Sequence, residues 1–253
     1  MWAVLAVSLL AQAPDGAPPA PAPDPWEGWL THFAADAGVG TAVPVSLGLE
    51  LHVEGPLGVF VDGGLGVMPP PYFQLVNQTV VALGGYDQTT ADFLSDSLED
   101  AMVLHVGGGL RPLPFLGLEL HAGWLYARGW GNVSSTDTVA LLTGRHPAAL
   151  ERLDLEVPAE TALHAFIVGV RYRFVVFEYL SIALEADYLQ ALTGDSRIVA
   201  EDLTLPGGAR AQEAEAAAID ELSDALDQYL DDTYATWVKA PVIGISVGGH
   251  FEL

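Results

Sequence analysis

Cysteine is absent from this chain of 253 residues, and lysine occurs once, at Lys239. Without cysteine the protein has no disulfide, no thiolate zinc site and no cysteine nucleophile. Basic residues are scarce as well: nine Lys and Arg stand against 33 Asp and Glu, which gives a net charge of −24. A chain this acidic is repelled by phosphate backbones, so we predict no nucleic-acid partner.

Long hydrophobic runs are also missing, although 51% of the residues are hydrophobic and the mean hydropathy is +0.33. A composition this apolar argues against disorder. A membrane-spanning helix needs about 20 uninterrupted apolar residues. The candidate segments, such as 166–189, are broken by charged residues. Two classes remain, a soluble domain with a large core and a β-barrel whose outer surface is apolar.

The chain begins MWAVLAVSLLAQA, which is typical of a secretory signal peptide over residues 1–13. An apolar run precedes small residues at Ala11 and Ala13, after which we expect cleavage. An ordinary apolar N-terminal strand or helix is the alternative. Residues 14–28 are rich in Pro and Ala and predict an extended linker. We assign residues 29–253 to one barrel domain.

Apolar and polar residues alternate in eight segments downstream, which predicts eight β-strands. In one of them, Leu47 and Leu49 share one face while Glu50 and His52 share the other. The predicted strands cover 32–41, 45–54, 58–68, 101–111, 116–128, 161–174, 179–190 and 242–253.

The polar face of each predicted strand combines glycines with charged side chains. A soluble sandwich or barrel would show the reverse, with an apolar interior and a polar exterior. The sequence therefore predicts an all-β, eight-stranded antiparallel up-and-down barrel of inverted polarity. Its apolar face contacts lipid, and its small and charged face fills a narrow lumen.

The connections between these strands alternate in length. Short links fall at 54–58, 112–115 and 175–179 and long ones at 69–100, 128–160 and 191–239, with one short link at 41–44 among the long ones. Outer-membrane barrels have tight periplasmic turns and long external loops, with both termini in the periplasm. Two aromatic girdles are predicted, one near the short links (Trp26, Trp29, Phe115, Tyr172, Phe174, Phe177, Tyr179, Phe251) and one near the long links (Trp124, Tyr126, Trp130, Tyr188, Trp237).

Across residues 29–253 this pattern resembles the small eight-stranded bacterial outer-membrane barrels of the OmpA and OmpX type. The last strand, VIGISVGGHFEL, looks like the C-terminal assembly signal of that family, which usually ends in Phe. Here Leu253 is last and Phe251 stands two residues before it. The resemblance implies a protein of the bacterial outer membrane that contacts its lipid and lipopolysaccharide and is inserted by the barrel-assembly machinery.

The long connections are expected to contain helices. Residues 209–235 place Leu222, Leu226 and Leu230 at helical spacing among acidic residues. Shorter helices are predicted around 71–83 and 87–101, on either side of Gly84-Gly85, and within 135–143 and 147–153. We expect a packed helical cap over the external mouth; a mobile or partner-binding helix is the alternative.

The inward side chains predict a polar network of carboxylates, arginines and histidines, comprising Asp36, Glu50, Asp62, His105, Arg111, Glu119, His121, Arg171, Arg173, Glu185, Asp187 and His250. Closing the hairpins places Asp36 opposite Glu50, Glu50 near Asp62, and His105 opposite His121. An eight-stranded barrel is only wide enough for its side chains to fill it, so we interpret the network as a salt-bridged plug. A narrow cation or proton path is the alternative.

The predicted histidine groups are weak candidates for a metal site. His105 and His121 form one group, and His32, His52 and His250 gather near the periplasmic end of neighbouring strands. Their spacing is scattered, and histidines in a polar lumen normally bond to carboxylates. We predict no metal and no cofactor.

Two enzyme classes occur on barrels of this type, lipid A deacylases and lipid A palmitoyltransferases. Ser134, Ser135, Asp137 and His146 lie in one external loop, but no motif joins them into a triad. We therefore predict a non-enzymatic barrel with a structural or surface-interaction role. A narrow cation-preferring pore or transport barrel and a soluble periplasmic ligand-binding barrel are the alternatives.

Overall fold

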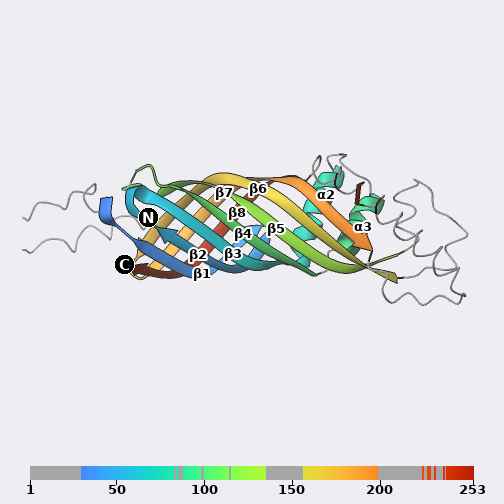
Figure 1. Cartoon of the computed structure of the whole chain (residues 1–253), viewed down its shortest axis with the longest axis horizontal. Helices are drawn as coiled ribbons and strands as arrows, with labels where there is room; N and C mark the ends of the chain where they lie inside the picture. The colour runs from blue at the N-terminus through green and yellow to red at the C-terminus, as the bar shows by residue number, and fades with distance from the viewer. Residues whose placement is uncertain are drawn as a thin grey trace, which may run out of the picture.

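Eight strands form a closed antiparallel barrel, so the predicted fold is confirmed (Figure 1). The computed structural model describes residues 30–82, 84, 88–97, 100–113, 115–134, 156–198, 224, 227–228, 231, 236 and 238–253. Each strand pairs with its neighbours in sequence, and the first pairs with the last. The strands are β1 (Ala34–Val43), β2 (Ser46–Glu54), β3 (Val59–Met68), β4 (Asp100–Leu110), β5 (Leu118–Ser134), β6 (Glu156–Val176), β7 (Leu180–Ile198) and β8 (Lys239–Glu252).

Two helices lie at one end of the barrel, between β3 and β4 (Figure 1). They are α2 (Pro70–Ala82) and α3 (Gln88–Ser97), which confirms the two helices predicted in this connection. Proline suits the first turn of a helix, and α2 begins with two prolines, one residue after the end of β3. A short 3₁₀ turn, η1 (Pro56–Gly58), joins β2 to β3 at the opposite end. None of the helices in the described part of the chain is long and apolar enough to cross a membrane.

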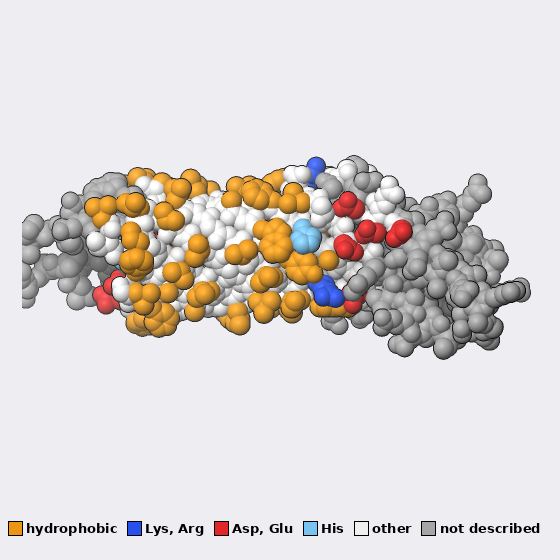
Figure 2. Space-filling model, viewed as in Figure 1, with side chains coloured by type: hydrophobic (Ala, Val, Ile, Leu, Met, Phe, Trp, Pro, Cys, Tyr) orange, Lys and Arg blue, Asp and Glu red, His pale blue; other side chains and the backbone are white. Residues whose placement is uncertain are grey.

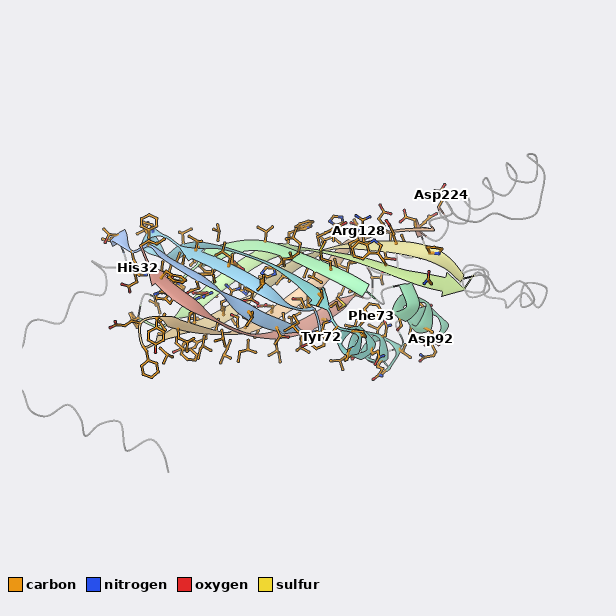
Figure 3. All side chains as sticks on the ribbon, turned by 90° about the horizontal axis from the view of Figure 1, so that it is seen from below. His32, Tyr72, Phe73, Asp92, Arg128 and Asp224 are labelled. Carbon is orange, nitrogen blue, oxygen red and sulfur yellow. The ribbon has the colours of Figure 1, made fainter. Side chains whose placement is uncertain are left out.

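The polarity of the barrel is inverted, as predicted. Leu49 is 64% exposed on the outer surface, whereas the Glu119 side chain is fully buried inside. Exposed apolar side chains on all eight strands form a band around the barrel. They cover much of the face seen in Figure 2, where acidic side chains gather at the helical end. Figure 3 shows His32 and Arg128 at opposite ends of this band. We call this band the apolar belt.

Three strands are longer than the sequence predicted. The apolar alternation places their ends at 128, 161 and 190, but β5 continues to Ser134, β6 begins at Glu156 and β7 reaches Ile198. β6 has 21 residues, about twice the length that a strand needs to cross a bilayer. These extensions project past the other strands at the helical end (Figure 1). They pair with one another, and outside the belt no rule requires alternate residues to be apolar.

The extension of β7 has a sheet edge that β8 does not cover, because their pairing stops at Gln190 and Lys239. Two aspartates cover part of this edge instead. The Gly194 backbone N–H donates to Asp231 Oδ1 and that of Ser196 to Asp227 Oδ1, each at 2.8 Å. Both aspartates belong to the helix predicted over residues 209–235, most of which lies outside the described residues.

The predicted pairing of residues was wrong in two hairpins. Asp36 lies opposite His52, not Glu50, because β1 continues to Val43 and the turn buries Val45 inside the barrel. Glu50 lies opposite Gly38 and Gly64.

The second error concerns the hairpin of β4 and β5, in which His121 lies opposite Gly109 and His105 opposite Leu125. The turn here is longer than predicted and includes Gly117. This glycine adopts a φ of 58°, which favours glycine, and its carbonyl accepts a hydrogen bond from the Arg173 backbone N–H. The partners of every residue on β5 therefore shift along β4.

Several predictions fall on residues outside the described part of the chain. They are the signal peptide (1–13), the linker (14–28), the helices within 135–143 and 147–153, and the girdle residues Trp26, Trp29 and Trp237.

Candidate functional site in the barrel lumen

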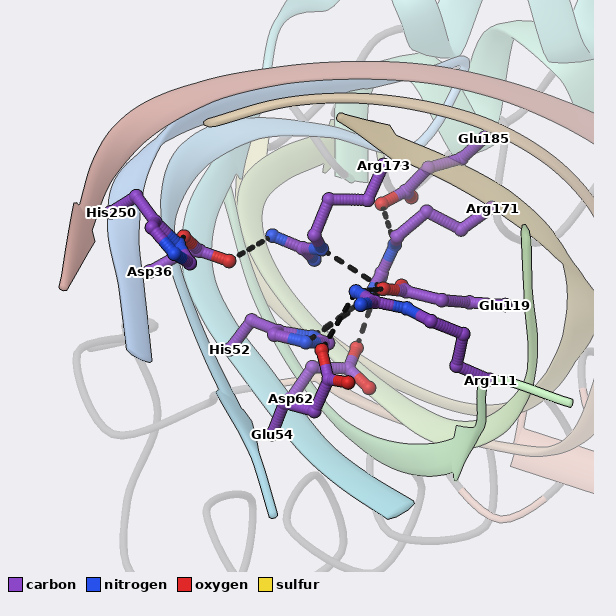
Figure 4. A network of polar contacts seen from close by, with 10 residues as sticks. All are labelled: Asp36, His52, Glu54, Asp62, Arg111, Glu119, Arg171, Arg173, Glu185 and His250. Carbon is purple, nitrogen blue, oxygen red and sulfur yellow. Dashed lines mark hydrogen bonds and ion pairs between the residues drawn. The ribbon is translucent and has the colours of Figure 1, made fainter. Parts of the chain in front are cut away.

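A network of ten buried or half-buried polar side chains fills the lumen near the end where the chain enters and leaves the barrel (Figure 4). We call it the polar plug. It consists of the arginines Arg111, Arg171 and Arg173, the carboxylates Asp36, Glu54, Asp62, Glu119 and Glu185, and the histidines His52 and His250. The side chains come from seven strands and the residue after β4, so the network joins most of the barrel wall.

Glu119 lies at the centre of the plug, where its carboxylate faces all three arginines. Arg111 Nη2 lies 3.0 Å and Arg173 Nε 3.1 Å from Glu119 Oε1. Arg171 Nη1 lies 3.7 Å from Glu119 Oε2. A fully buried carboxylate is stable only when it is paired, and these three cations provide the pairing.

Arg171 links the centre of the plug to the wall. Its Nε contacts Glu185 on β7, and its Nη2 lies 3.2 Å from Asp62 Oδ2 on β3. Its guanidinium lies 5.9 Å from the centre of the Phe60 ring, close enough for a cation–π contact. One arginine thus holds together strands on opposite sides of the lumen.

The other two arginines reach the strands near the chain ends. Arg173 Nη1 donates to Asp36 Oδ2 at 2.6 Å, and the other oxygen of Asp36 lies 2.7 Å from His250 Nδ1. Arg111 Nη2 lies 2.7 Å from Glu54 Oε2. The contact between Asp36 and His250 joins β1 to β8, so the plug crosses the closure of the barrel. The contact between Arg111 and Glu54 joins the end of β4 to β2.

A second polar pair lies farther from the chain ends, where His121 Nε2 and Asp187 Oδ1 are 2.8 Å apart. These residues are not on adjacent strands, since both lie opposite Gly169 of the intervening β6. A Cβ at position 169 would collide with the Asp187 carboxylate. Gly169 is therefore the residue that lets the two side chains meet across it.

Glu50 and His105 lie between the plug and this pair. Gly64 lies opposite His105, and its lack of a side chain leaves room for the imidazole ring. Both Glu50 and His105 line two small cavities of about 20 and 40 Å³. These cavities are large enough for a few water molecules at most.

The structure thus brings eight of the twelve predicted residues into one connected network. They are Asp36, Asp62, Arg111, Glu119, Arg171, Arg173, Glu185 and His250. His121 and Asp187 form their own pair, and Glu50 and His105 line the cavities beside them.

Phe60 is missing from the interior predicted from the sequence, whereas His52 and Glu54 were expected to point inwards but were not assigned to the network. All three occupy inward positions of β2 and β3 and are buried. The alternation that places Glu50 and Asp62 inside also places these residues inside, because side chains two apart share a face. The signal was therefore present for all three.

His52, Glu54 and Glu119 each offer a ligand atom, and these atoms lie within 4.8 Å of one another. Such a group could hold a metal ion in other surroundings. Here Arg111 already contacts both carboxylates, and Arg171 and Arg173 also face Glu119. A divalent cation would have to displace or face three guanidinium groups, so we assign no metal to this group.

Beyond the His121–Asp187 pair, the interior changes from polar to apolar. The inward side chains at this level are buried and form one hydrophobic cluster, namely Val45, Val103, Leu125, Ala127, Ala165, Leu189 and Val242. The lumen therefore has two layers, a charged one near the chain ends and an apolar one near α2. The predicted small and charged lining is correct only for the first.

No protein-family model matches the chain, and no curated protein matches its sequence. Comparison with solved structures finds similar barrels. The N-terminal β-barrel domain of Pseudomonas aeruginosa OprF has 9% identity and a TM-score of 0.35, over 87% of this chain and 98% of that one.

Two further solved barrels are similar. A major outer membrane protein from Thermus thermophilus has 15% identity and a TM-score of 0.40, over 88% of this chain and 99% of that one. Acinetobacter baumannii CarO has 13% identity and a TM-score of 0.34, with the same two coverages. These likenesses to solved structures are all at low sequence identity.

Proposed function

We propose that this protein is an integral barrel of the bacterial outer membrane whose lumen is closed to ions and whose helical end faces outwards. The observation that carries the proposal is the combination of an apolar belt outside with a charged plug inside. Lipid and lipopolysaccharide are the partners of the belt. The protein then acts as a structural element of the envelope or as a surface for interaction outside the cell.

The belt favours a membrane over water as the surroundings of the barrel. Leucine and valine side chains that are about half exposed or more follow one another along the outer face, as at Leu47, Leu49 and Leu51 on β2. Soluble monomers rarely expose a contiguous apolar surface of this kind. This argues against the soluble ligand-binding barrel considered above.

Side chains at the two edges of the belt fit the interfaces of a bilayer. At the helical edge the rings of Trp124, Tyr126 and His164 lie 5.1 to 5.9 Å apart, and Arg128 lies over Trp130. At the other edge Phe177 and Tyr179 stack, with ring centres 6.2 Å apart. Aromatic girdles of this kind mark membrane–water interfaces.

The orientation follows from the lengths of the connections. η1 and two other short turns join strands at the end near the termini. The three long connections follow β3, β5 and β7 at the other end, and the first of them carries α2 and α3. Short turns are periplasmic and long loops external in bacterial barrels. We therefore place α2 and α3 outside the cell.

We expect the full chain, expressed in a bacterium with an outer membrane, to fractionate with that membrane and to migrate faster on gels when unboiled. The apolar belt requires lipid, and a closed barrel resists detergent unless it is heated.

The matched control is residues 14–253 with an initiator Met, which lacks the proposed signal and is expected to stay in the cytoplasm. The intact mass of the membrane form should match cleavage after Ala11 or Ala13. Recovery of the full chain in the soluble periplasm would contradict the proposal.

The plug favours a closed lumen over a pore. Purified, refolded protein is expected to give no discrete current steps in a planar bilayer, because the side chains of Glu119 and the three arginines cross the lumen. A general porin added afterwards to the same bilayer is the control for detection. Reproducible cation-selective steps from the purified protein would support the pore instead.

The lipid A-modifying enzyme has no support from the described residues. Ser135, Asp137 and His146 lie outside them, and the side chain of Ser134 is not described.

A further inference from the structure

The apolar layer of the lumen contains a cavity that the proposed function does not use. It lies between the barrel wall and α2 and is lined by Val45, Met68, Phe73, Leu125, Leu163 and Leu189, among others. Its volume is about 60 Å³, larger than either polar cavity. Figure 3 shows Phe73 on α2 at the barrel end. We call this cavity the apolar chamber.

Water is a poor occupant of the chamber. Among the described residues that line it, only Asn77 and Thr161 are polar. The Asn77 amide already donates to the Ala91 carbonyl and to Ser95 Oγ, and Thr161 Oγ1 accepts a hydrogen bond from Ser196 Oγ. A buried water needs two to four polar partners, and cavities without them stay dry and bind small apolar molecules.

The chamber is also separated from the charged part of the lumen. The buried side chains of Leu125 and Val242 stand between it and the His121–Asp187 pair. No charged side chain is among the described residues that line the chamber, so none of these residues offers a counter-ion to a charged ligand. This restricts the ligand to uncharged hydrocarbon groups, since burying an unpaired charge is costly.

Helix α2 covers the chamber at the helical end of the barrel. Phe73 and Val76 of α2 cover the chamber, and a 2.7 Å hydrogen bond between Tyr72 and Thr41 ties α2 to β1. α2 follows β3 with one intervening residue, so the helix is held at the mouth by a short tether. A ligand that enters at the helical end does not pass the polar plug.

We infer that the apolar chamber is a binding site for a small uncharged hydrocarbon group, such as a single aromatic ring or a short alkyl chain, taken up at the helical end. The site does not depend on the proposed membrane location, because the chamber lies inside the barrel. The apolar belt explains insertion into a membrane, and the polar plug explains a closed lumen. The chamber adds the binding of a small apolar ligand to these two properties.

Benzene is the probe for this site, used on the full-length protein refolded in detergent micelles with ¹³C-labelled Leu and Val methyl groups. Benzene also dissolves in the micelle, so outward methyls such as Leu120 and Leu184 are expected to shift linearly with its concentration. Chamber methyls of Leu125, Leu163 and Leu189 are expected to shift along a saturating curve. Benzylammonium, which is charged, is expected to leave the chamber methyls unchanged.

A matched pair of variants on β5 tests the location. Ala127→Leu fills the chamber and is expected to abolish the saturating shifts, whereas Ala122→Leu adds the same atoms to the outer surface and is expected to preserve them. Ala101→Val is a second filling variant if Ala127→Leu does not fold. Linear shifts of chamber methyls in the unmodified protein, or saturating shifts that persist in a folded filling variant, would overturn the inference.

Discussion

Replacing Arg171 with methionine is expected to lower the free energy of unfolding by about 3–5 kcal/mol at neutral pH. Arg171 is 4% exposed and pairs with Asp62 and Glu185 as well as with Glu119. Methionine retains much of the side-chain stem but none of the charge, so these carboxylates stay buried without one of their cations. Urea unfolding in phospholipid vesicles, followed by tryptophan fluorescence, measures the loss.

The matched control is Arg128→Met on the outer surface. Arg128 pairs with Glu160 at 2.9 Å, but its side chain is exposed, and such pairs contribute about 0–1 kcal/mol. If both variants lost the same amount of stability, burial would not be the cause. The plug would then be no more important than a surface ion pair.

The assignment of side chains to the inside or outside of the barrel could be predicted from sequence. The period of two in a strand fixes which residues share a face, and glycines beside charged residues identify the crowded interior. That rule correctly placed Glu50 and Arg171 inside and Leu49 outside. It depends only on neighbours within a strand.

The contacts within the plug could not be predicted in the same way, because they depend on how far each turn extends. The burial of Val45 goes with a β1 that is longer than predicted. The left-handed conformation of Gly117 goes with a longer turn between β4 and β5. Each change moved the partners of a whole hairpin. A pairing such as Asp36 with His52 is therefore visible only once the turns are known.

The apolar layer and the strand extensions were missed for a different reason. The prediction treated the lumen as uniform, whereas the cap formed by α2 lets inward positions such as Leu125 and Leu189 be apolar. The extensions of β5, β6 and β7 lie beyond the apolar belt and carry no lipid-facing alternation. Both features depend on long-range packing rather than on local pattern.

Replacing Leu49 with arginine is expected to lower the free energy of unfolding in vesicles by about 2–4 kcal/mol. Leu49 is 64% exposed in the middle of β2, and its neighbours across the sheet, Val39 and Leu65, also face outwards. An arginine here would lie near the centre of the bilayer, where lipid cannot solvate its charge. If the belt faced water, the same substitution would cost almost nothing.

Depth in the bilayer supplies the control. Val59 is 56% exposed at the start of β3, next to η1 and therefore at the edge of the belt. Val59→Arg is expected to cost about 0–1 kcal/mol, because an arginine near the interface reaches water and headgroups. Leu49→Ala separates the loss of apolar contact from the added charge. Equal costs for Leu49→Arg and Val59→Arg would mean that depth does not matter, and the belt would then not span a bilayer.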